Sequence, residues 1–317
     1  MPKFRCWETC RAQAREYKQR GRIFTLEEQL INYLSRVDTP CTKRRIQNFV
    51  HQGVDIEGYP FLVYAILGNC TKKIIELLLD YGANMYMEDF YSNGTNAIMM
   101  AIRAQRLDII ILFLKNGLDP NHVMWRGMTP LHAAALCGQH DIVQYLLASG
   151  AFKDVRDVTG NTALHFAVKG SRLTIVNLLL TIGFNPNTKN SFCETPIFMV
   201  RNLDVMESLL RWGAMTNVCN RNGDTPLHRL VKYRSPMIIK MLIDHQANPL
   251  ITNKQNRSAI DIARFHERKS IDFPISNLLI QYSHVVKKQY ETLTNQILEK
   301  NKQEQNIKNI IMDFIFD

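Results

Sequence analysis

Three histidines, His132, His165 and His228, occupy the same place in three similar tetrapeptides and are the first candidates for chemistry. An imidazole can act as a general base or bind a metal, so a catalytic or a zinc site is one interpretation. If each histidine lies in its own layer of packed helices, equivalent positions stand roughly 10 Å apart. That spacing is too wide for three side chains to share one zinc ion.

The cysteines give no better metal site. Cys6 and Cys10 are one helical turn apart and could share an ion, but no second ligand pair with usable spacing follows them. The total of seven is odd, and most cysteines fall within predicted helices or turns. This usage indicates reduced thiols in a cytosolic or nuclear protein.

Motifs that mark enzymes are missing as well. The sequence has no Gly-rich phosphate loop, no Gly-x-Ser-x-Gly elbow and no His-Glu-x-x-His pair. We therefore expect no catalytic residue, no metal and no cofactor, and we predict that the protein is not an enzyme.

The elements that carry these histidines are short helical hairpins. In the stretch from Met128 to Val155, Thr129 can cap a helix and Pro130 suits its first turn. Leu131, Ala134 and Ala135 then follow at helical spacing, and Gly138 can end the helix. A second apolar stripe runs from Ile142 to Leu147 and stops at Gly150. Such a hairpin cannot cover its own inner face.

The hairpin recurs along the chain. Thr129-Pro130-Leu131-His132 is followed by Thr162-Ala163-Leu164-His165, 33 residues later, and again by Thr225-Pro226-Leu227-His228. A 33-residue period with this signature resembles the ankyrin repeat. The resemblance implies an all-α solenoid in which each histidine hydrogen-bonds the threonine of its own motif and nearby backbone, and so has a structural role.

Aligning the glycines that end each hairpin predicts about seven helical-hairpin units. Gln246 stands in the last glycine slot. The unit at Thr195 is three residues short, so we expect a shortened first helix or a tightened helix–helix turn there, with a local bend or opening of the array. The predicted unit starts are Phe61, Asn96, Thr129, Thr162, Thr195, Thr225 and Ser258.

The ends of the chain differ from the repeats. We predict a basic N-terminal arm at residues 1–24, a helical cap or degenerate repeat at 25–57, the array at 58–283, and an amphipathic helix with an apolar tail at 284–317. The C-terminal helix could be a cap of the array or a docking or self-association element.

Charge and hydropathy bound the location and the partners. The net charge is +10, and residues 1–22 contain seven Lys and Arg against two Glu. We find no signal peptide and no apolar run of about 20 residues, so no membrane contact is expected. We predict a cytoplasmic protein, with the nucleus as the other compartment.

Function is expected on the surface, in the loops between repeats (the fingers) and along the first helices. Their cations and aromatic rings predict a basic concave groove for an acidic protein segment, because complementary charge favours binding. The alternative is a scattered, solvated basic surface. The candidate partner-binding residues are Tyr91, Arg103, Trp125, Arg126, Arg156, Phe166, Lys169, Lys189, Arg221, Arg229, Lys232 and Lys254.

These observations favour a non-enzymatic adaptor or inhibitor. The resemblance includes inhibitors that retain transcription factors, substrate receptors of ubiquitin ligases and host-range proteins of large DNA viruses. No SOCS or F-box pattern follows Ser283, which argues against the ligase receptors. A nucleic-acid binder that uses the basic arm and groove is the second hypothesis, although no nucleic-acid-binding motif is present.

Overall fold

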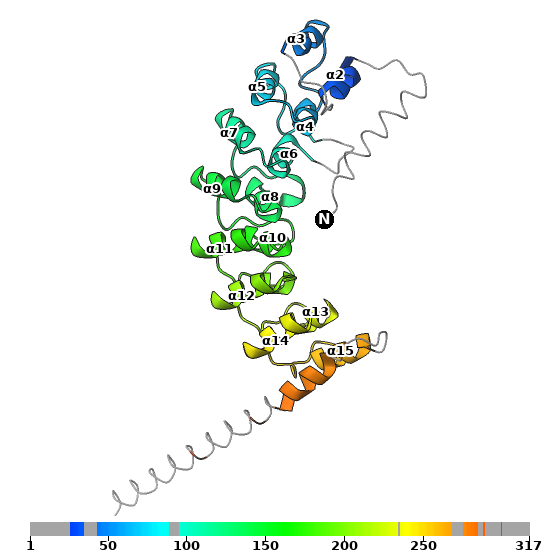
Figure 1. The fold of residues 1–317 in the computed structure, drawn as a ribbon, viewed down its shortest axis with the longest axis vertical. Helices are drawn as coiled ribbons and strands as arrows, with labels where there is room; N and C mark the ends of the chain where they lie inside the picture. Colours follow the sequence, from blue (N-terminus) through cyan, green and yellow to red (C-terminus); the bar gives the residue numbers. More distant parts are fainter. Residues whose placement is uncertain are drawn as a thin grey trace, which may run out of the picture. The chain divides into compact units, whose positions relative to one another are not determined.

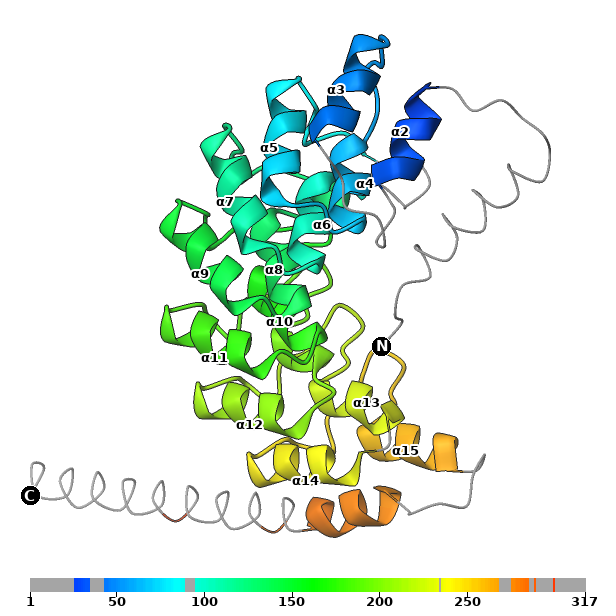
Figure 2. The same ribbon diagram turned by 45° about the horizontal axis from the view of Figure 1, so that its top comes forward.

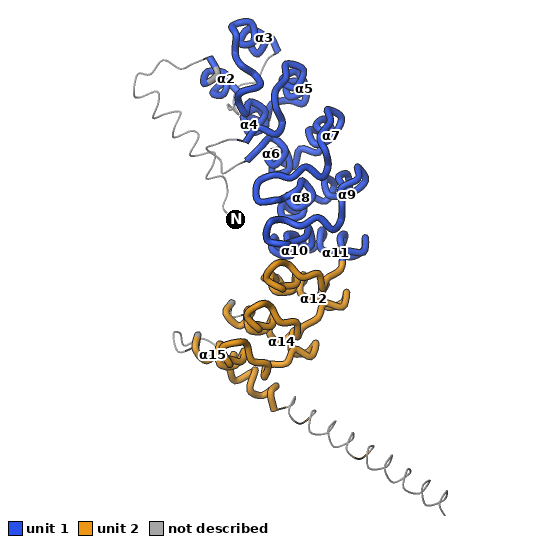
Figure 3. The backbone as a smooth tube through the Cα atoms, turned by 180° about the vertical axis from the view of Figure 1, so that it is seen from behind, with its two compact units in different colours: residues 1–184 blue, residues 185–317 orange. Residues whose placement is uncertain are grey.

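The computed structural model describes residues 26–34, 43–88, 95–233, 235–267, 275–284, 288 and 299. Within these ranges the fold is all-α, as predicted, and β structure amounts to isolated bridges such as the one between Thr252 and Ser258. The chain divides into two compact units, residues 1–184 (unit 1) and 185–317 (unit 2), which Figure 3 distinguishes by colour.

Unit 1 is a series of helix pairs. The pairs are α2 (Leu26–Leu34) and α3 (Lys43–His51), α4 (Phe61–Leu67) and α5 (Lys72–Asp80), α6 (Ala97–Arg103) and α7 (Leu107–Lys115), α8 (Pro130–Cys137) and α9 (His140–Ala148), and α10 (Ala163–Lys169) and α11 (Leu173–Thr181). First helices contact first helices in the order α2, α4, α6, α8, α10 (Figure 1). Second helices form another row from α5 through α7 and α9 to α11 (Figure 2).

Unit 2 continues the same design with shorter first helices. It contains η2 (Pro196–Met199) and α12 (Leu203–Arg211), α13 (Pro226–Leu230) with η3 (Val231–Tyr233) and α14 (Pro236–Asp244), then α15 (Ala259–Glu267) and a helical segment at 275–284. The three-residue deletion reduces the first helix of the unit at Thr195 to one 3₁₀ turn. The predicted shortening is therefore confirmed.

The two helix rows differ in burial because of their apolar patterns. Almost every residue of α8 is buried, since it packs on α6, on α10 and on its own partner α9. Helix α9 buries only Ile142, Val143 and Leu146 and turns its other side to solvent. Burying a side chain of this size contributes about 1.5–3 kcal/mol, so stacking neighbouring pairs stabilises hairpins that would not fold alone.

Left-handed residues end the second helices, as the glycine alignment predicts. Gly150 has φ 93° and Gly183 has φ 98°, which is a conformation that glycine adopts without steric cost. Gln246 takes the same conformation with φ 65° in the slot where the sequence lacks glycine.

Asparagines four residues after these glycines link successive repeats inside each unit. Asn121 Nδ2 donates to Gly150 O at 3.1 Å, while Asn121 Oδ1 accepts from Phe152 N at 2.7 Å. Asn187 and Asn217 make the same pair of bonds to the next repeat in unit 2. Each side chain therefore satisfies two backbone groups that the ends of the helices leave open.

Several predictions about the ends fall outside the described residues. The arm at 1–24 is one of them, and so is most of the tail at 284–317. The domain boundaries stay predictions. Among the described residues, no helix combines the length and apolar character needed to cross a membrane.

Candidate functional site

The three histidines are built into the helix starts. Thr129 N donates to His132 Nδ1 at 3.0 Å, and the other imidazole nitrogen, Nε2, lies 3.0 Å from Val155 O in the following finger. His228 repeats this arrangement with Thr225 N at 3.1 Å and Arg257 O at 3.0 Å. Since Nδ1 accepts a hydrogen bond from the backbone N–H, Nε2 carries the hydrogen and donates to the carbonyl. The imidazoles of His132 and His228 thus each join their own repeat to the next.

At His132 and His228 these bonds use both imidazole nitrogens. Burial lowers the pKa of His132 and of His228 below the usual 6.5, against the opposing effect of the bonds to Val155 O and Arg257 O. A neutral imidazole suits the structural role because it needs one donor and one acceptor nitrogen. Within the described ranges, no three His, Cys, Asp or Glu side chains gather closely enough to hold a metal ion.

The lowered pKa values predict that acid weakens the fold. Because the unfolded histidines keep a pKa near 6.5, the unfolded chain binds more protons than the folded chain below that pH. The stabilisation is complete above pH 6.5 and is lost as the pH falls through the lowered folded pKa. Urea unfolding between neutral pH and about pH 5, above the carboxylate range, should show this loss.

A His228→Gln variant is the control for the acid prediction. Glutamine can keep the bond to the Thr225 backbone in a capping box but does not titrate. Its stability should therefore depend less on pH over the same window. A wild-type stability that stays constant or rises on acidification would contradict the prediction.

The fingers share one internal design in four repeats. An Asp or Asn oxygen accepts the backbone N–H groups of the residues two and four positions later, and one residue of the loop has positive φ. The residues in this position are Asp157, Asn190, Asn220 and Asn253. Neighbouring fingers are also tied together, with Arg221 N donating to Phe192 O at 2.9 Å and Lys254 N to Asn222 O at 3.0 Å.

The predicted cations at the fingers and first helices are mostly exposed. Arg103 and Lys169 end α6 and α10 in unit 1, and Lys232 holds the same slot in η3 of unit 2. Lys169 Nζ lies 6.0 Å from the centroid of the Phe166 ring. Exposed side chains from the fingers complete the set: Trp125, Arg126, Arg156, Lys189, Arg221 and Lys254.

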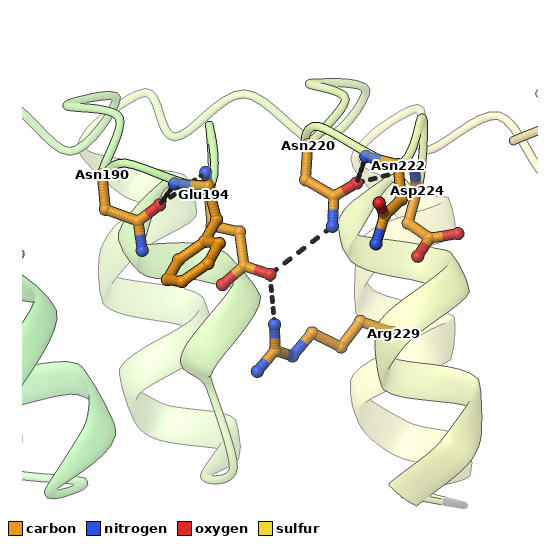
Figure 4. A network of polar contacts seen from close by, with 7 residues as sticks. Asn190, Glu194, Asn220, Asn222, Asp224 and Arg229 are labelled. Carbon is orange, nitrogen blue, oxygen red and sulfur yellow. Dashed lines mark hydrogen bonds and ion pairs between the residues drawn. The ribbon is translucent and has the colours of Figure 1, made fainter. Parts of the chain in front are cut away.

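Two of the predicted contact residues need correction. Phe166 is only 5% exposed because it packs against His132, with ring centroids 5.3 Å apart, and so it cannot serve as an exposed anchor. Arg229 forms an ion pair with the buried Glu194 (Figure 4). Asn220 Nδ2 also approaches the Glu194 carboxylate at 3.5 Å. Arg229 is therefore committed to neutralising a carboxylate of its own unit.

A hollow of about 440 Å³ lies beside α15 in unit 2. Its cations are Lys232, Arg257 and Arg264, and the exposed ring of Phe265 lies at its edge. The two carboxylates in its wall already accept internal bonds, Asp224 from Asn253 Nδ2 at 2.7 Å and Asp261 from Ser258 Oγ at 2.7 Å. Bonds from Ser258 and the charge of Arg264 hold the pKa of Asp261 below its usual value.

The sequence argument missed Arg264 and Phe265. Phe265 stands seven residues after the unit start Ser258, which is the slot that selected Arg103, Lys169 and Lys232, so extending the slot by one unit would have found it. Among the predicted residues, Tyr91 lies outside the described part of the chain.

Comparison with known proteins identifies the family to which this helical architecture belongs. Models of ankyrin repeats match residues 38–124, 119–190 and 222–254, more than half of the chain. Ankyrin repeat protein FPV031 of fowlpox virus (strain NVSL) is 30% identical over 54% of this chain and 54% of its own length. FPV230 of the same virus is 28% identical over 50% of this chain and 87% of its own length.

Some similar proteins carry enzyme names. The L-asparaginase of Dirofilaria immitis is 30% identical over 43% of this chain, but the match spans only 23% of that protein. The similarity therefore covers only a small part of that protein. The family models, the helix starts capped by a Thr and a His, and the stacked helix pairs all indicate ankyrin repeats. The chain therefore belongs to the ankyrin-repeat family, whose arrays are protein–protein interaction modules.

Proposed function

We propose that this chain is a non-enzymatic adaptor or inhibitor that holds an acidic segment of a partner protein. The observation that carries the proposal is the slot at the ends of the first helices. In unit 1 this slot holds the exposed cations Arg103 and Lys169, and in unit 2 it holds Lys232. Arg103 and Lys169 lie on the two first helices that flank α8, whose residue in this slot is Leu136, and like charges close together favour a ligand of opposite charge.

The fingers support the same partner chemistry. Arg126 and Arg156 project from adjacent fingers of unit 1, and Arg221 and Lys254 from adjacent fingers of unit 2. In the fingers of Arg156, Arg221 and Lys254, the Asp or Asn at the loop start supplies internal bonds, so folding does not require a particular outward sequence. All four basic side chains are exposed, although Arg156 Nη1 also donates to Gly160 O at 3.2 Å. The similarity to two fowlpox virus proteins supports a role in host–virus interaction.

Charge reversal at the slot is the test. We expect an Arg103→Glu and Lys169→Glu double variant to bind its partners about tenfold more weakly, since two favourable charges become repulsive. The matched control is Lys73→Glu with Lys115→Glu, which makes the same change in net charge on exposed positions of the second helices α5 and α7. Quantitative affinity purification with isotope labels compares the three proteins.

The outcomes separate the hypotheses. Partners that the control retains and the slot variant loses support the proposal. Equal recovery with both variants would exclude this slot as the binding surface. If nuclease treatment removes the partners and binding weakens steeply with salt, the chain binds nucleic acid instead.

A further inference from the structure

One finger of unit 1 is folded differently from the four regular fingers that begin at Asp157, Asn190, Asn220 and Asn253. At residues 124–128, which we name the Trp125 finger, the position of the loop-folding Asp or Asn is taken by Met124, whose side chain is buried. Two backbone bonds match those of the regular fingers, from Met124 N to Met128 O at 2.7 Å and from Gly127 N to Met124 O at 3.0 Å. The Trp125 finger adds a bond from Met128 N to Trp125 O at 3.4 Å, in place of the side-chain bonds that the Asp or Asn makes in the regular fingers.

The turn places an arginine where arginine is unfavourable. Arg126 has φ 60° and Gly127 has φ 72°, so two successive residues are left-handed, whereas each of the four regular fingers has one. Such turns prefer Asn-Gly, because a side chain other than Asn or Asp is strained at positive φ. Folding therefore does not explain why arginine occupies position 126.

The conformation sets the arginine over an exposed ring. The Arg126 guanidinium carbon lies 4.2 Å from the centroid of the Trp125 ring, and 48% of Trp125 is exposed. The finger is fixed to its neighbour, since Val158 N donates to Arg126 O at 3.1 Å, and Val158 itself is 69% exposed. A tryptophan, an aliphatic side chain and a guanidinium thus share the ends of two joined fingers.

The charges around this site select the ligand. Asp157, the carboxylate at the base of the neighbouring finger, accepts from Thr159 N at 3.0 Å, from Thr159 Oγ1 at 2.8 Å and from Asn161 N at 2.7 Å. Its acceptor capacity is used inside its own loop. The same loop carries a second exposed cation, Arg156, whose Nη1 donates to Gly160 O at 3.2 Å. An approaching group therefore meets apolar surface and positive charge together.

We propose that the Trp125 finger is the anchor of the partner site and binds an apolar side chain that neighbours a carboxylate in an acidic peptide segment. The apolar side chain packs on Trp125 and Val158, and the carboxylate pairs with the Arg126 guanidinium, which can donate two parallel hydrogen bonds. Tryptophan and arginine are the residue types that most often dominate binding energy at interfaces. This inference rests on the proposed function, because it assigns one site within that surface.

The test separates recognition from folding by means of Arg126→Asn. Asparagine is favoured in this turn, so the unfolding midpoint should stay equal or rise, while peptide binding weakens about tenfold. Trp125→Ala should weaken binding to a similar degree. The controls are Lys115→Asn, which removes one charge from the second helix α7, and Phe152→Ala, which removes an exposed ring (66% exposed) from another loop of unit 1.

The probe is a random-peptide library displayed on phage and selected on the wild-type chain, and the selected peptides are then titrated against each variant. Peptides with an aromatic or aliphatic residue next to Asp or Glu, which lose affinity with both finger variants and with neither control, support the anchor. If acidic peptides are selected but bind the finger variants as well as wild type, the anchor is overturned and the proposed function stands. Selected peptides without acidic residues, or no selected peptides, overturn both.

Discussion

Replacing His228 with alanine should lower the free energy of unfolding by about 3 kcal/mol, more than a hundredfold in the folding equilibrium. The imidazole is fully buried and serves two repeats at once. Its loss leaves Thr225 N and the Thr225 hydroxyl without their partner and removes the bond to Arg257 O, 29 residues along the chain. A cavity of imidazole size adds to the cost. Urea denaturation followed by far-UV circular dichroism measures the change.

His140→Ala is the matched control for that measurement. His140 is exposed at the start of α9, and its Nδ1 lies 3.3 Å from Oδ1 of Asp141, its immediate neighbour in sequence. Its replacement should change stability by no more than about 0.5 kcal/mol, as is usual for surface positions. Similar destabilisation by the two substitutions would show that His228 has no special place in the packing between repeats.

The fold could be predicted from the sequence because it depends on local sequence patterns. The Thr-Pro-Leu-His starts, the terminal glycines and the 33-residue period each specify a helix boundary, and all of them point to the same stack. Even the deletion at Thr195 translated directly into a shorter first helix, since a helix of one turn is what the remaining residues allow.

The candidate binding surface was harder to predict, because the exposure of each side chain depends on contacts between repeats. Phe166 and Arg229 both fall four residues after a threonine start, but one is covered by His132 of the preceding repeat and the other reaches back to Glu194. Neither contact follows from the period. The unusual turn at Arg126 was also invisible, since Trp-Arg-Gly has none of the Asn-Gly preference that marks such turns.

Thr195 and Thr225 should respond in opposite ways to the same substitution. Both begin a first helix and both are fully or almost fully buried. The Thr225 hydroxyl lies 2.8 Å from His228 Nδ1, whereas Phe198 fills the histidine slot after Thr195. Within the described part of the chain, Thr195 Oγ1 is the buried side-chain polar atom without a hydrogen-bond partner. Burying an unpaired hydroxyl costs about 1–3 kcal/mol, so Thr195 is a weak point of the array.

Valine has nearly the shape of threonine without the hydroxyl. Thr225→Val should therefore destabilise the fold by about 2 kcal/mol, because it removes the hydroxyl that bonds His228 Nδ1 and that accepts from the His228 backbone N–H. Thr195→Val should leave the stability unchanged or raise it by about 1 kcal/mol, because it removes only an unmade bond. The denaturant midpoint of each variant, compared with that of wild type, measures the change in stability, provided that the m-value stays the same. Equal destabilisation by the two substitutions would mean that the Thr195 hydroxyl has a hydrogen-bond partner in solution. The replacement of the motif histidine by Phe198 would then not leave that hydroxyl unpaired.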